Sequence, residues 1–350
     1  MSNAPSKVTI KDIAQRANVS LGTASKVLNG DSSVKESNRR AVEEAVRELN
    51  YNVNKVARSL AHKPLRFGIL LPSEFKEYYR PMLNGIRSAV AALSDFKVSA
   101  TFERYANYND DEKVIAYLDK FEEEGIDGLI LGPSRVCEYS GRIAKLQKKR
   151  IPVIVLMSDM VNSGRLACVD VDAKLSGKIA VDLSKLILEK DESVAIFIGN
   201  KDMVEHRIKM ESFLDQAKKQ GVRIAGVREA HENPVEAYEL TAELLEKCTD
   251  LRLIYVATAN SESVCRCIHA HGRQGKVHVI ATDILADLRP YVEDGTVVAV
   301  LDQHLWQQGD VAVDVLYKYL TEAVLNKEET KVAPSLLLKS SILAQLNMPE

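Results

Sequence analysis

A short segment near the start of the chain carries side chains that could read nucleic-acid bases. Small, apolar and basic residues recur on one face of residues 20–29 at helical spacing, and the opposite face is apolar. A lysine amino group donates hydrogen bonds to guanine, and a leucine can contact the methyl group of thymine. These outward positions predict a helix that reads bases in a major groove. They are Leu21, Gly22, Ser25, Lys26 and Asn29.

Three short helices would position these side chains. Thr9 caps the first, with Asp12 three residues on in a variant of the capping box, and Ser20 caps the second. Ser33 with Glu36 is a capping box for the third. The pattern predicts a helix-turn-helix with its turn at residues 17–19, although two helices at this spacing also occur in small bundles that bind no DNA. The expected core positions are Ile10, Ile13, Ala14, Ala17, Ala24, Val27, Leu28, Val42, Val46 and Leu49.

The next segment carries a more specific motif. Residues 49–61, LNYNVNKVARSLA, together with residues 8–30, resemble the lactose-repressor/galactose-repressor (LacI/GalR) family of bacterial transcription regulators. Residues 66–72, 169–180, 277–283 and 297–309 are similar to that family's effector domain, in the branch closest to sugar-binding periplasmic proteins. The resemblance therefore covers nearly the whole chain.

The resemblance implies how DNA is bound. One head reads only a half-site, so we expect a homodimer on a near-palindromic operator. The family also implies a hinge that folds on DNA, with Leu60 entering a minor-groove step. We expect DNA contacts from Thr9, Ser20, Leu21, Gly22, Thr23, Ser25, Lys26, Asn29, Tyr51, Asn54, Ala57, Arg58 and Leu60.

The charge is distributed unevenly along the 350 residues. Residues 1–65 hold 11 Lys+Arg and 6 Asp+Glu, a net charge of 11 − 6 = +5, and the remainder holds 36 and 43, a net charge of 36 − 43 = −7. A basic head on an acidic body is typical of a nucleic-acid-binding arm, because phosphate neutralisation supplies much of non-specific DNA affinity.

The composition also indicates the cellular location of the protein. No apolar stretch approaches the roughly 20 residues of a membrane helix, and no signal-peptide pattern is present. The five cysteines are an odd number, scattered along the chain, which favours reduced thiols. We expect a cytoplasmic bacterial protein without a membrane partner, associated with the nucleoid when bound to DNA.

The body alternates apolar strands with amphipathic helices, which predicts parallel sheets covered by helices on both faces. The number of strand–helix units is larger than a single open sheet usually holds, so we expect two doubly wound lobes. The resemblance implies that these lobes form a periplasmic-binding-protein-like pair with a cleft and three chain crossings. The expected strands are residues 67–71, 98–102, 128–131, 153–156, 168–171, 194–198, 253–256, 277–281 and 297–301.

The domain boundaries follow from this organisation. We assign residues 1–51 to a small all-α helix-turn-helix head and residues 52–65 to the hinge. The N-lobe is assigned residues 66–160 and 304–332, and the C-lobe residues 161–303 and 333–350. The crossings are expected near residues 159–164, 284 and 303.

Polar and aromatic residues at strand ends mark the expected cleft. In sugar-binding relatives of the family, an aromatic pair stacks on the sugar ring, and Tyr78 and Tyr79 occupy the matching positions. Asp283 and Gln303 follow expected strands, at the edge where open α/β sheets bind ligands. Local capping is the alternative role for both of these residues.

The chain departs from the family pattern at two cleft positions. The family has an Arg where Lys209 stands, with Arg207 nearby, and Lys lacks the planar fork of the guanidinium. The family has an Asp or Asn where Met157 stands, which leaves Ser158 and Asp159 as the nearby polar candidates. Asn260 follows a strand and either reaches the ligand or caps a helix.

Other chemistry has little support in the sequence. Residues 265–271, CRCIHAH, hold four metal-type side chains, but at helical spacing they split into two pairs on different faces. No common catalytic or phosphate-binding motif occurs. We expect no enzyme activity, metal or cofactor, and a ligand-responsive repressor whose effector is a sugar or sugar derivative. An α/β enzyme with a helical appendage and a sugar-binding protein without gene control remain the alternatives.

Overall fold

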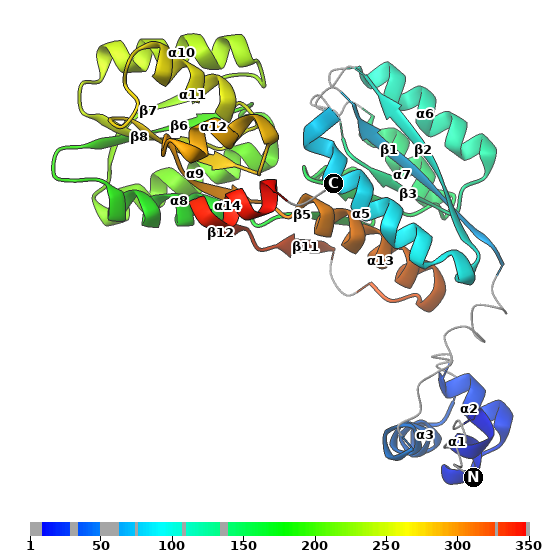
Figure 1. The fold of residues 1–350 in the computed structure, drawn as a ribbon. Helices are drawn as coiled ribbons and strands as arrows, with labels where there is room; N and C mark the ends of the chain where they lie inside the picture. The colour runs from blue at the N-terminus through cyan, green and yellow to red at the C-terminus, as the bar shows by residue number, and fades with distance from the viewer. Residues whose placement is uncertain are drawn as a thin grey trace.

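The head is a bundle of three helices with its own apolar core. The computed structural model describes residues 9–28, 34–49, 63–73, 76–106, 110–133, 139–325 and 328–347. The helices are α1 (Ile10–Arg16), α2 (Leu21–Leu28) and α3 (Glu36–Glu48) (Figure 1). Their apolar faces meet around Ile13, Ala24 and Val42, which are buried, as the sequence pattern predicts.

Local hydrogen bonds fix the two helices of the predicted helix-turn-helix. The Thr9 amide and hydroxyl both donate to the Asp12 carboxylate at 2.7 Å, and the Ser20 hydroxyl accepts from the Thr23 amide at 3.1 Å. Asn18, in the turn between them, has a positive φ of 50°, a conformation that Asn tolerates better than most residues.

The third helix begins later than predicted. Glu36 is its first residue and Lys35 is the N-cap, without a side-chain capping bond. Glu36 therefore does not stand at the third helical position that a capping box with Ser33 requires, and that expectation is wrong. Ser33 itself lies outside the described residues.

The body contains two six-stranded sheets. In the first, the strand order is β11-β5-β4-β3-β1-β2, and all neighbouring strands are parallel. Helices cover both of its faces, as expected for parallel strands. The strands are β1 (Leu65–Pro72), β2 (Val98–Tyr105), β3 (Gly128–Leu131), β4 (Val153–Leu156), β5 (Ala167–Val171) and β11 (Glu329–Val332).

The second sheet repeats this design. Its order is β12-β10-β9-β8-β6-β7, parallel except for the antiparallel pair β10–β12. All nine strands predicted from the sequence are present across the two sheets, and β7, β11 and β12 were not predicted. The strands are β6 (Ser193–Ile198), β7 (Arg223–Glu229), β8 (Leu251–Val256), β9 (His278–Thr282), β10 (Val297–Asp302) and β12 (Ser335–Leu338).

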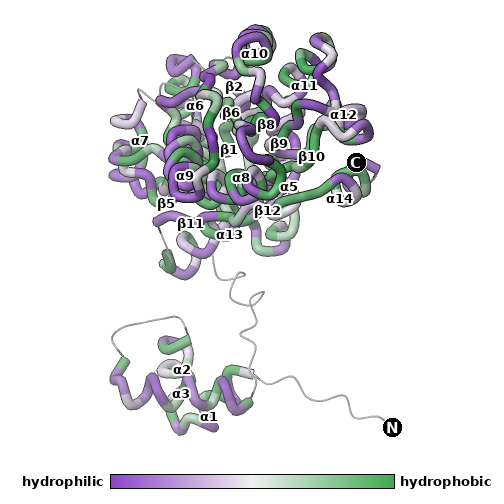
Figure 2. Tube along the Cα trace, turned by 90° about the vertical axis from the view of Figure 1, so that its left-hand side faces the viewer, coloured by the Kyte–Doolittle hydropathy of each residue, from purple (hydrophilic) through white to green (hydrophobic). Residues whose placement is uncertain are grey.

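Helices bury their apolar faces on each sheet. On the first sheet, α5 (Lys76–Ala92) and α13 (Leu305–Glu322) share one core, and α6 (Asp111–Glu124) and α7 (Ser140–Lys148) share the other. Hydrophobic residues concentrate along the inner strands, and the helices carry hydrophilic stretches outward (Figure 2). On the second sheet, α8 (Ala173–Ile187) and α9 (Val204–Gln220) share one core. The other core is shared by α10 (Pro234–Lys247), α11 (Ser261–Ala270), α12 (Arg289–Glu293) and α14 (Lys339–Leu346). Short 3-10 turns lie at Ser94–Phe96 and Ala286–Leu288.

The chain passes between the two sheets at three places. β5 pairs with β4 and β11, so the chain leaves the first sheet only after Val171, and the boundary predicted near residues 159–164 is too early. No crossing lies near residue 284, because β9 and β10 are neighbours in the second sheet. The other crossings fall between Asp302 and Leu305 and between Val332 and Ser335.

Helices α5 and α13 approach each other closely enough to require glycine. A Cβ atom on Gly85 would lie 2.0 Å from the Trp306 carbonyl oxygen, and one on Gly309 would lie 2.4 Å from the Met82 carbonyl oxygen. This contact joins the first helix of the lobe to the segment that returns from the second sheet.

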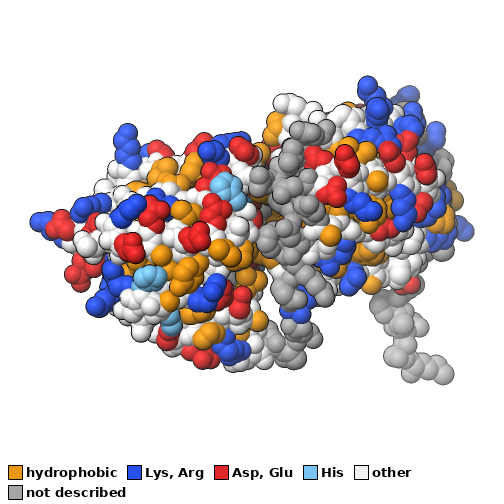
Figure 3. All heavy atoms as spheres, turned by 90° about the horizontal axis from the view of Figure 1, so that it is seen from above, with side chains coloured by type: hydrophobic (Ala, Val, Ile, Leu, Met, Phe, Trp, Pro, Cys, Tyr) orange, Lys and Arg blue, Asp and Glu red, His pale blue; other side chains and the backbone are white. Residues whose placement is uncertain are grey.

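The surface of the body is mixed. Charged side chains of both signs alternate with hydrophobic ones on the face shown in Figure 3. Within the described part of the chain, no helix has the length and apolar character needed to cross a membrane.

Candidate ligand cleft and DNA-reading face

The exposed face of α2 carries the predicted base-reading side chains. Leu21 is 46% exposed although it is a large apolar residue, and Gly22 and Lys26 are also exposed. An added Cβ on Gly22 would meet nothing closer than the Ser20 hydroxyl at 3.8 Å, so packing within the head does not require glycine there. Glycine costs about 1 kcal/mol in a helix relative to alanine. The absence of a side chain at Gly22 therefore favours close approach of a partner to the backbone of α2.

The remaining predicted DNA contacts divide into two groups. The Thr23 hydroxyl lies 2.9 Å from that of Ser20 at the start of α2, and Ser25 is half-buried. Thr9 is exposed at the start of α1. The others lie outside the described residues: Asn29, Tyr51, Asn54, Ala57, Arg58 and Leu60.

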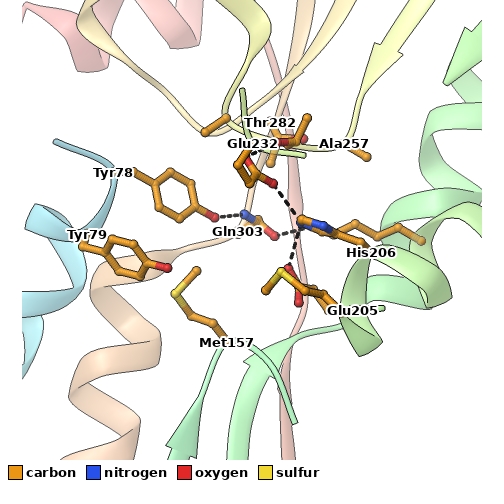
Figure 4. Close-up of a pocket in the computed structure, with 13 residues that line it drawn as sticks. Tyr78, Tyr79, Met157, Glu205, His206, Glu232, Ala257, Thr282 and Gln303 are labelled. Atoms are coloured by element: carbon orange, nitrogen blue, oxygen red, sulfur yellow. Dashed lines mark hydrogen bonds and ion pairs between the residues drawn. The ribbon is translucent and has the colours of Figure 1, made fainter. Parts of the chain in front are cut away.

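A partly open cavity lies between the two sheets of the body. Its walls come from helix α5 and the end of β4 on the first lobe, and from α9 and the strand ends of the second lobe (Figure 4). Pockets at the carboxyl ends of parallel strands are the usual ligand sites of open α/β sheets. The lining residues are Tyr78, Tyr79, Met157, Met203, Glu205, His206, Lys209, Glu232, Ala257, Thr258, Ala259, Thr282 and Gln303.

A chain of hydrogen bonds crosses this cavity from one lobe to the other. The Gln303 amide nitrogen donates to the Tyr78 hydroxyl at 2.8 Å, and the Gln303 amide oxygen accepts from the Lys209 ammonium at 2.8 Å. Lys209 is only 2% exposed. Tyr78 belongs to α5 of the first lobe, and Lys209 belongs to α9 of the second. The cavity is therefore bridged by polar groups from both lobes.

Asp283 lies behind Gln303 and fixes its orientation. One Asp283 oxygen accepts from the Gln303 backbone amide at 2.7 Å, and the other accepts from its side-chain amide at 2.6 Å. Burial raises the pKa of Asp283 to about 6, and the hydrogen bonds from Gln303 oppose that rise. Asp283 lines a neighbouring cavity that also borders Tyr78, and it contacts the cavity described here through Gln303.

The two tyrosines form the predicted aromatic pair. Their rings are nearly perpendicular, at 89°, with centroids 5.3 Å apart. Burial and the neighbouring carboxylates raise the pKa of Tyr78, so its hydroxyl stays protonated. Aromatic faces offer stacking surface to the apolar C–H groups of a ligand.

Besides Asp283, four of the predicted ligand residues do not line this cavity. Ser158 is buried nearby, and Asp159 is held in an ion pair by the guanidinium of Arg165. Arg207 donates to the Lys201 carbonyl oxygen at 3.1 Å. Asn260 is buried at the start of α11 without capping it, and its amide nitrogen has no hydrogen-bond partner.

Three ionisable residues on the second-lobe wall of the cavity, Glu205, His206 and Glu232, were not predicted from the sequence. His206 Nε2 lies 3.2 Å from a Glu205 oxygen and 3.6 Å from a Glu232 oxygen, and the Thr258 hydroxyl donates to Glu232 at 2.6 Å. Glu232 has a positive φ of 56°, a backbone conformation that is costly for a non-glycine residue. No local motif marks these residues, because they come from separate loops and helix starts.

The cysteine and histidine cluster of α11 forms no common site. Cys267 Sγ lies 3.5 Å from His271 Nδ1, whereas Cys265 is buried in the core of the second lobe. Within the described residues, no group of three or more histidine, cysteine and acidic side chains has a geometry that could hold a metal ion.

These features define a class of protein. A helix-turn-helix head precedes a two-lobed α/β body with a polar cleft between the lobes. Residues 9–54 match the family described as bacterial regulatory proteins, lacI family, and residues 67–323 match the periplasmic binding protein domain. The chain therefore belongs to the LacI family of bacterial regulatory proteins.

Relatives of this family cover most of the chain. Catabolite control protein A of Priestia megaterium is 26% identical over 91% of this chain and 94% of its own length. The HTH-type transcriptional regulator pepR1 of Lactobacillus delbrueckii subsp. lactis is 26% identical over 96% of this chain and 98% of its own length.

Solved structures match the body. The glucose-galactose binding protein GanP of Geobacillus stearothermophilus has a TM-score of 0.69 at 24% identity, covering 80% of this chain and 99% of that one. A periplasmic ribose ABC transporter protein of Conexibacter woesei has a TM-score of 0.74 at 19% identity, covering 82% and 96%. At these identities the likeness establishes the periplasmic-binding-protein-like fold.

Proposed function

We propose that this chain is a repressor that binds a near-palindromic operator as a homodimer and responds to a small sugar-like effector in the interlobe cleft. The observation that carries the proposal is the hydrogen-bond chain Tyr78–Gln303–Lys209, which spans the cavity between the two lobes of a body that matches the periplasmic binding protein domain. An effector that replaces these bonds would change the relative free energies of the lobe arrangements.

The head supports the DNA-binding half of the proposal. Residues 9–54 match the family's DNA-binding model, and the exposed face of α2 presents Leu21, Gly22 and Lys26. In this account α2 enters the major groove, Lys26 donates to guanine and Leu21 contacts a thymine methyl. Two heads related by a twofold axis would read two half-sites, which requires a near-palindrome.

The cleft supports the effector half. Structural relatives of the body include a glucose-galactose binding protein and a ribose transport protein. The tyrosine pair offers aromatic surface for a sugar ring, and Gln303 and Lys209 offer polar partners for its hydroxyls. Lys209 takes the place of the family's usual arginine, and Arg207 does not line the cavity.

Control of DNA affinity follows from population shift. An effector that binds one lobe arrangement more tightly shifts the dimer toward it, and a head attached through residues 52–65 then gains or loses the spacing that both half-sites require. Domain assignments for this mechanism are the head at residues 1–51, the hinge at residues 52–65, and the two lobes of the body.

Operator selection tests the proposal. The full chain is incubated with a pool of random duplexes, bound DNA is sequenced, and the mass of the complex is measured by sedimentation. We expect a near-palindromic consensus bound by two chains. An asymmetric half-site bound by one chain, or recovery of random sequence, would overturn the dimeric operator model.

A further inference from the structure

The cavity wall formed by the second lobe carries more negative charge than hydroxyl binding explains. Glu205 is the second residue of α9, and Glu232 directly precedes the N-cap of α10. Their side chains are only 8% and 16% exposed. Figure 4 shows the two carboxylates on either side of the His206 ring. Buried carboxylates are costly unless they are paired.

His206 does not neutralise this pair. Its Nδ1 atom accepts a hydrogen bond from the backbone N–H of Asn200 at 2.9 Å. Nδ1 therefore carries no proton, and the ring is in its neutral form. The single remaining proton is on Nε2, which lies 3.2 Å from Glu205 and 3.6 Å from Glu232. One N–H group thus lies near two carboxylates and contributes no positive charge.

One carboxylate oxygen has no partner at all. Glu205 Oε2 is buried and accepts no hydrogen bond, although Glu205 lines the cavity. By contrast, Glu232 is held by the Thr258 hydroxyl at 2.6 Å. An unsatisfied buried carboxylate oxygen is rare and calls for an explanation. Here the oxygen belongs to a cavity residue, where a bound ligand can satisfy it.

The other charge on the cavity wall does not balance these two. Among the described residues that line the cavity, Lys209 is the only lysine or arginine, and its ammonium donates to Gln303. Asp283 adds a further carboxylate behind Gln303. The negative charges of Asp283, Glu205 and Glu232 all raise the pKa of Tyr78, after the larger effect of burial. The ionisable side chains in and behind the cavity wall therefore carry more negative than positive charge.

We propose that the effector carries a protonated amine, which makes it an amino sugar, and that its ammonium group binds the carboxylates of both Glu205 and Glu232. An ammonium group offers three donors, enough for Glu205 Oε2 and for a Glu232 oxygen, and both bonds are charge-assisted. The remaining hydroxyls of the ring face Tyr78, Gln303 and Lys209. The inference rests on the proposed function, because it specifies the chemistry of the same effector.

Calorimetry with matched pairs of sugars tests the charge requirement. The full chain is titrated with D-glucosamine, D-galactosamine and 6-amino-6-deoxy-D-glucose, and with the parent sugar of each. We expect at least one amine to bind about tenfold or more tightly than its parent. The N-acetyl forms of the 2-amino sugars keep the nitrogen but remove its charge, so they should bind no better than the parent sugars.

Isosteric variants identify the carboxylate. Glu205→Gln should weaken the preferred amine about tenfold and leave the parent sugar within about twofold. Glu211→Gln makes the same chemical change on an exposed position of α9 and should leave both affinities unchanged. Because Glu205 Oε2 has no partner, Glu205→Gln should unfold at the same or a higher temperature than the natural chain.

Three results would overturn the inference. Parent sugars could bind as tightly as all the amines, Glu205→Gln could weaken amine and parent equally, or Glu205→Gln could lower the unfolding temperature, which would assign Glu205 a structural role. If a neutral sugar binds as tightly as the amines and changes operator affinity, the proposed function stands and the inference of an amine is rejected. Failure of operator selection would instead remove the proposed function itself.

Discussion

Lys209 and Gln303, 94 positions apart in the chain, meet in a buried hydrogen bond of 2.8 Å in the wall of the interlobe cavity. Gln303 in turn donates to Tyr78 of the other lobe and to Asp283. The amide of Gln303 therefore has both donors and one acceptor position occupied. An effector entering this cavity must compete with these bonds or add to the donors of Lys209, and both routes link effector binding to the contact between the lobes.

The raised pKa of Asp283 predicts a pH dependence of stability. Its pKa rises from the ordinary 3.8 to about 6, so the folded chain holds this proton in a pH range where the unfolded chain has lost it. The free energy of unfolding should therefore fall as the pH rises through this range, by up to about 3 kcal/mol for this one group. Roughly 1.3 kcal/mol of this change should fall between about pH 5 and about pH 7, and urea unfolding at these two values, on the natural chain and on Asp283→Asn, measures it.

The Asn variant should lose this slope. Other titrating groups such as Asp170, whose pKa is also raised to about 6 by burial, are common to both proteins and cancel in the comparison. Equal slopes in the two proteins would show that Asp283 does not retain its proton on folding.

The close approach of α5 and α13 predicts an unusual sign for a helix substitution. Gly→Ala within a helix ordinarily stabilises by roughly 0.5–1 kcal/mol. At Gly85 the added methyl would meet the Trp306 carbonyl at 2.0 Å, so we expect Gly85→Ala to destabilise by about 1–3 kcal/mol or more.

A matched substitution provides the control. Gly141, in α7, has no atom within 4 Å of an added Cβ, so Gly141→Ala should be neutral or stabilising in the same thermal-unfolding assay. Stabilisation by both changes would contradict the packing described for α5 and α13.

Base discrimination tests the reading face of α2. Lys26→Ala should lower discrimination by about 1–3 kcal/mol at a single base pair, because a specific donor to guanine is lost. Lys145→Ala, an exposed lysine of α7 on the body, serves as the control and should change nothing. Fluorescence anisotropy with the selected operator and its single-base variants measures both. Equal weakening on operator and random DNA would assign Lys26 to phosphate contact instead.

The sequence predicted the strands well because their signal is local. Buried strands such as β3 and β4 are short apolar runs bounded by turn residues. β7 was missed because it is an edge strand, only partly buried, in which Gly226 and Arg228 interrupt the apolar residues. β11 is polar at three of its four residues, and β12 is a short leucine run that leads directly into α14, so periodicity alone does not separate it from a helix.

Sheet membership and the cavity wall depend on tertiary contacts that no local pattern records. β5 pairs with β4 inside the first sheet, and β11 adds to that sheet beyond β5, and neither pairing is visible in the local sequence near residue 160. Tyr78, Tyr79 and Gln303 were predicted from the family motif and line the cavity, as does Lys209. Glu205 and Glu232 were missed because exposed helix starts and loops often carry such acids, and only the fold buries them together.

The coupling of effector and operator tests the central claim most directly. Operator affinity is measured by anisotropy with and without a saturating cleft ligand, on the natural chain, on Lys209→Met and on Arg207→Met, whose parent side chain does not line the cavity. The account predicts a change of about tenfold or more in operator affinity for the natural chain and Arg207→Met, a coupling of roughly 1–3 kcal/mol. Lys209→Met should bind operator normally and lose this response. Unchanged operator affinity in the natural chain, with calorimetry showing the cleft filled, would contradict the account.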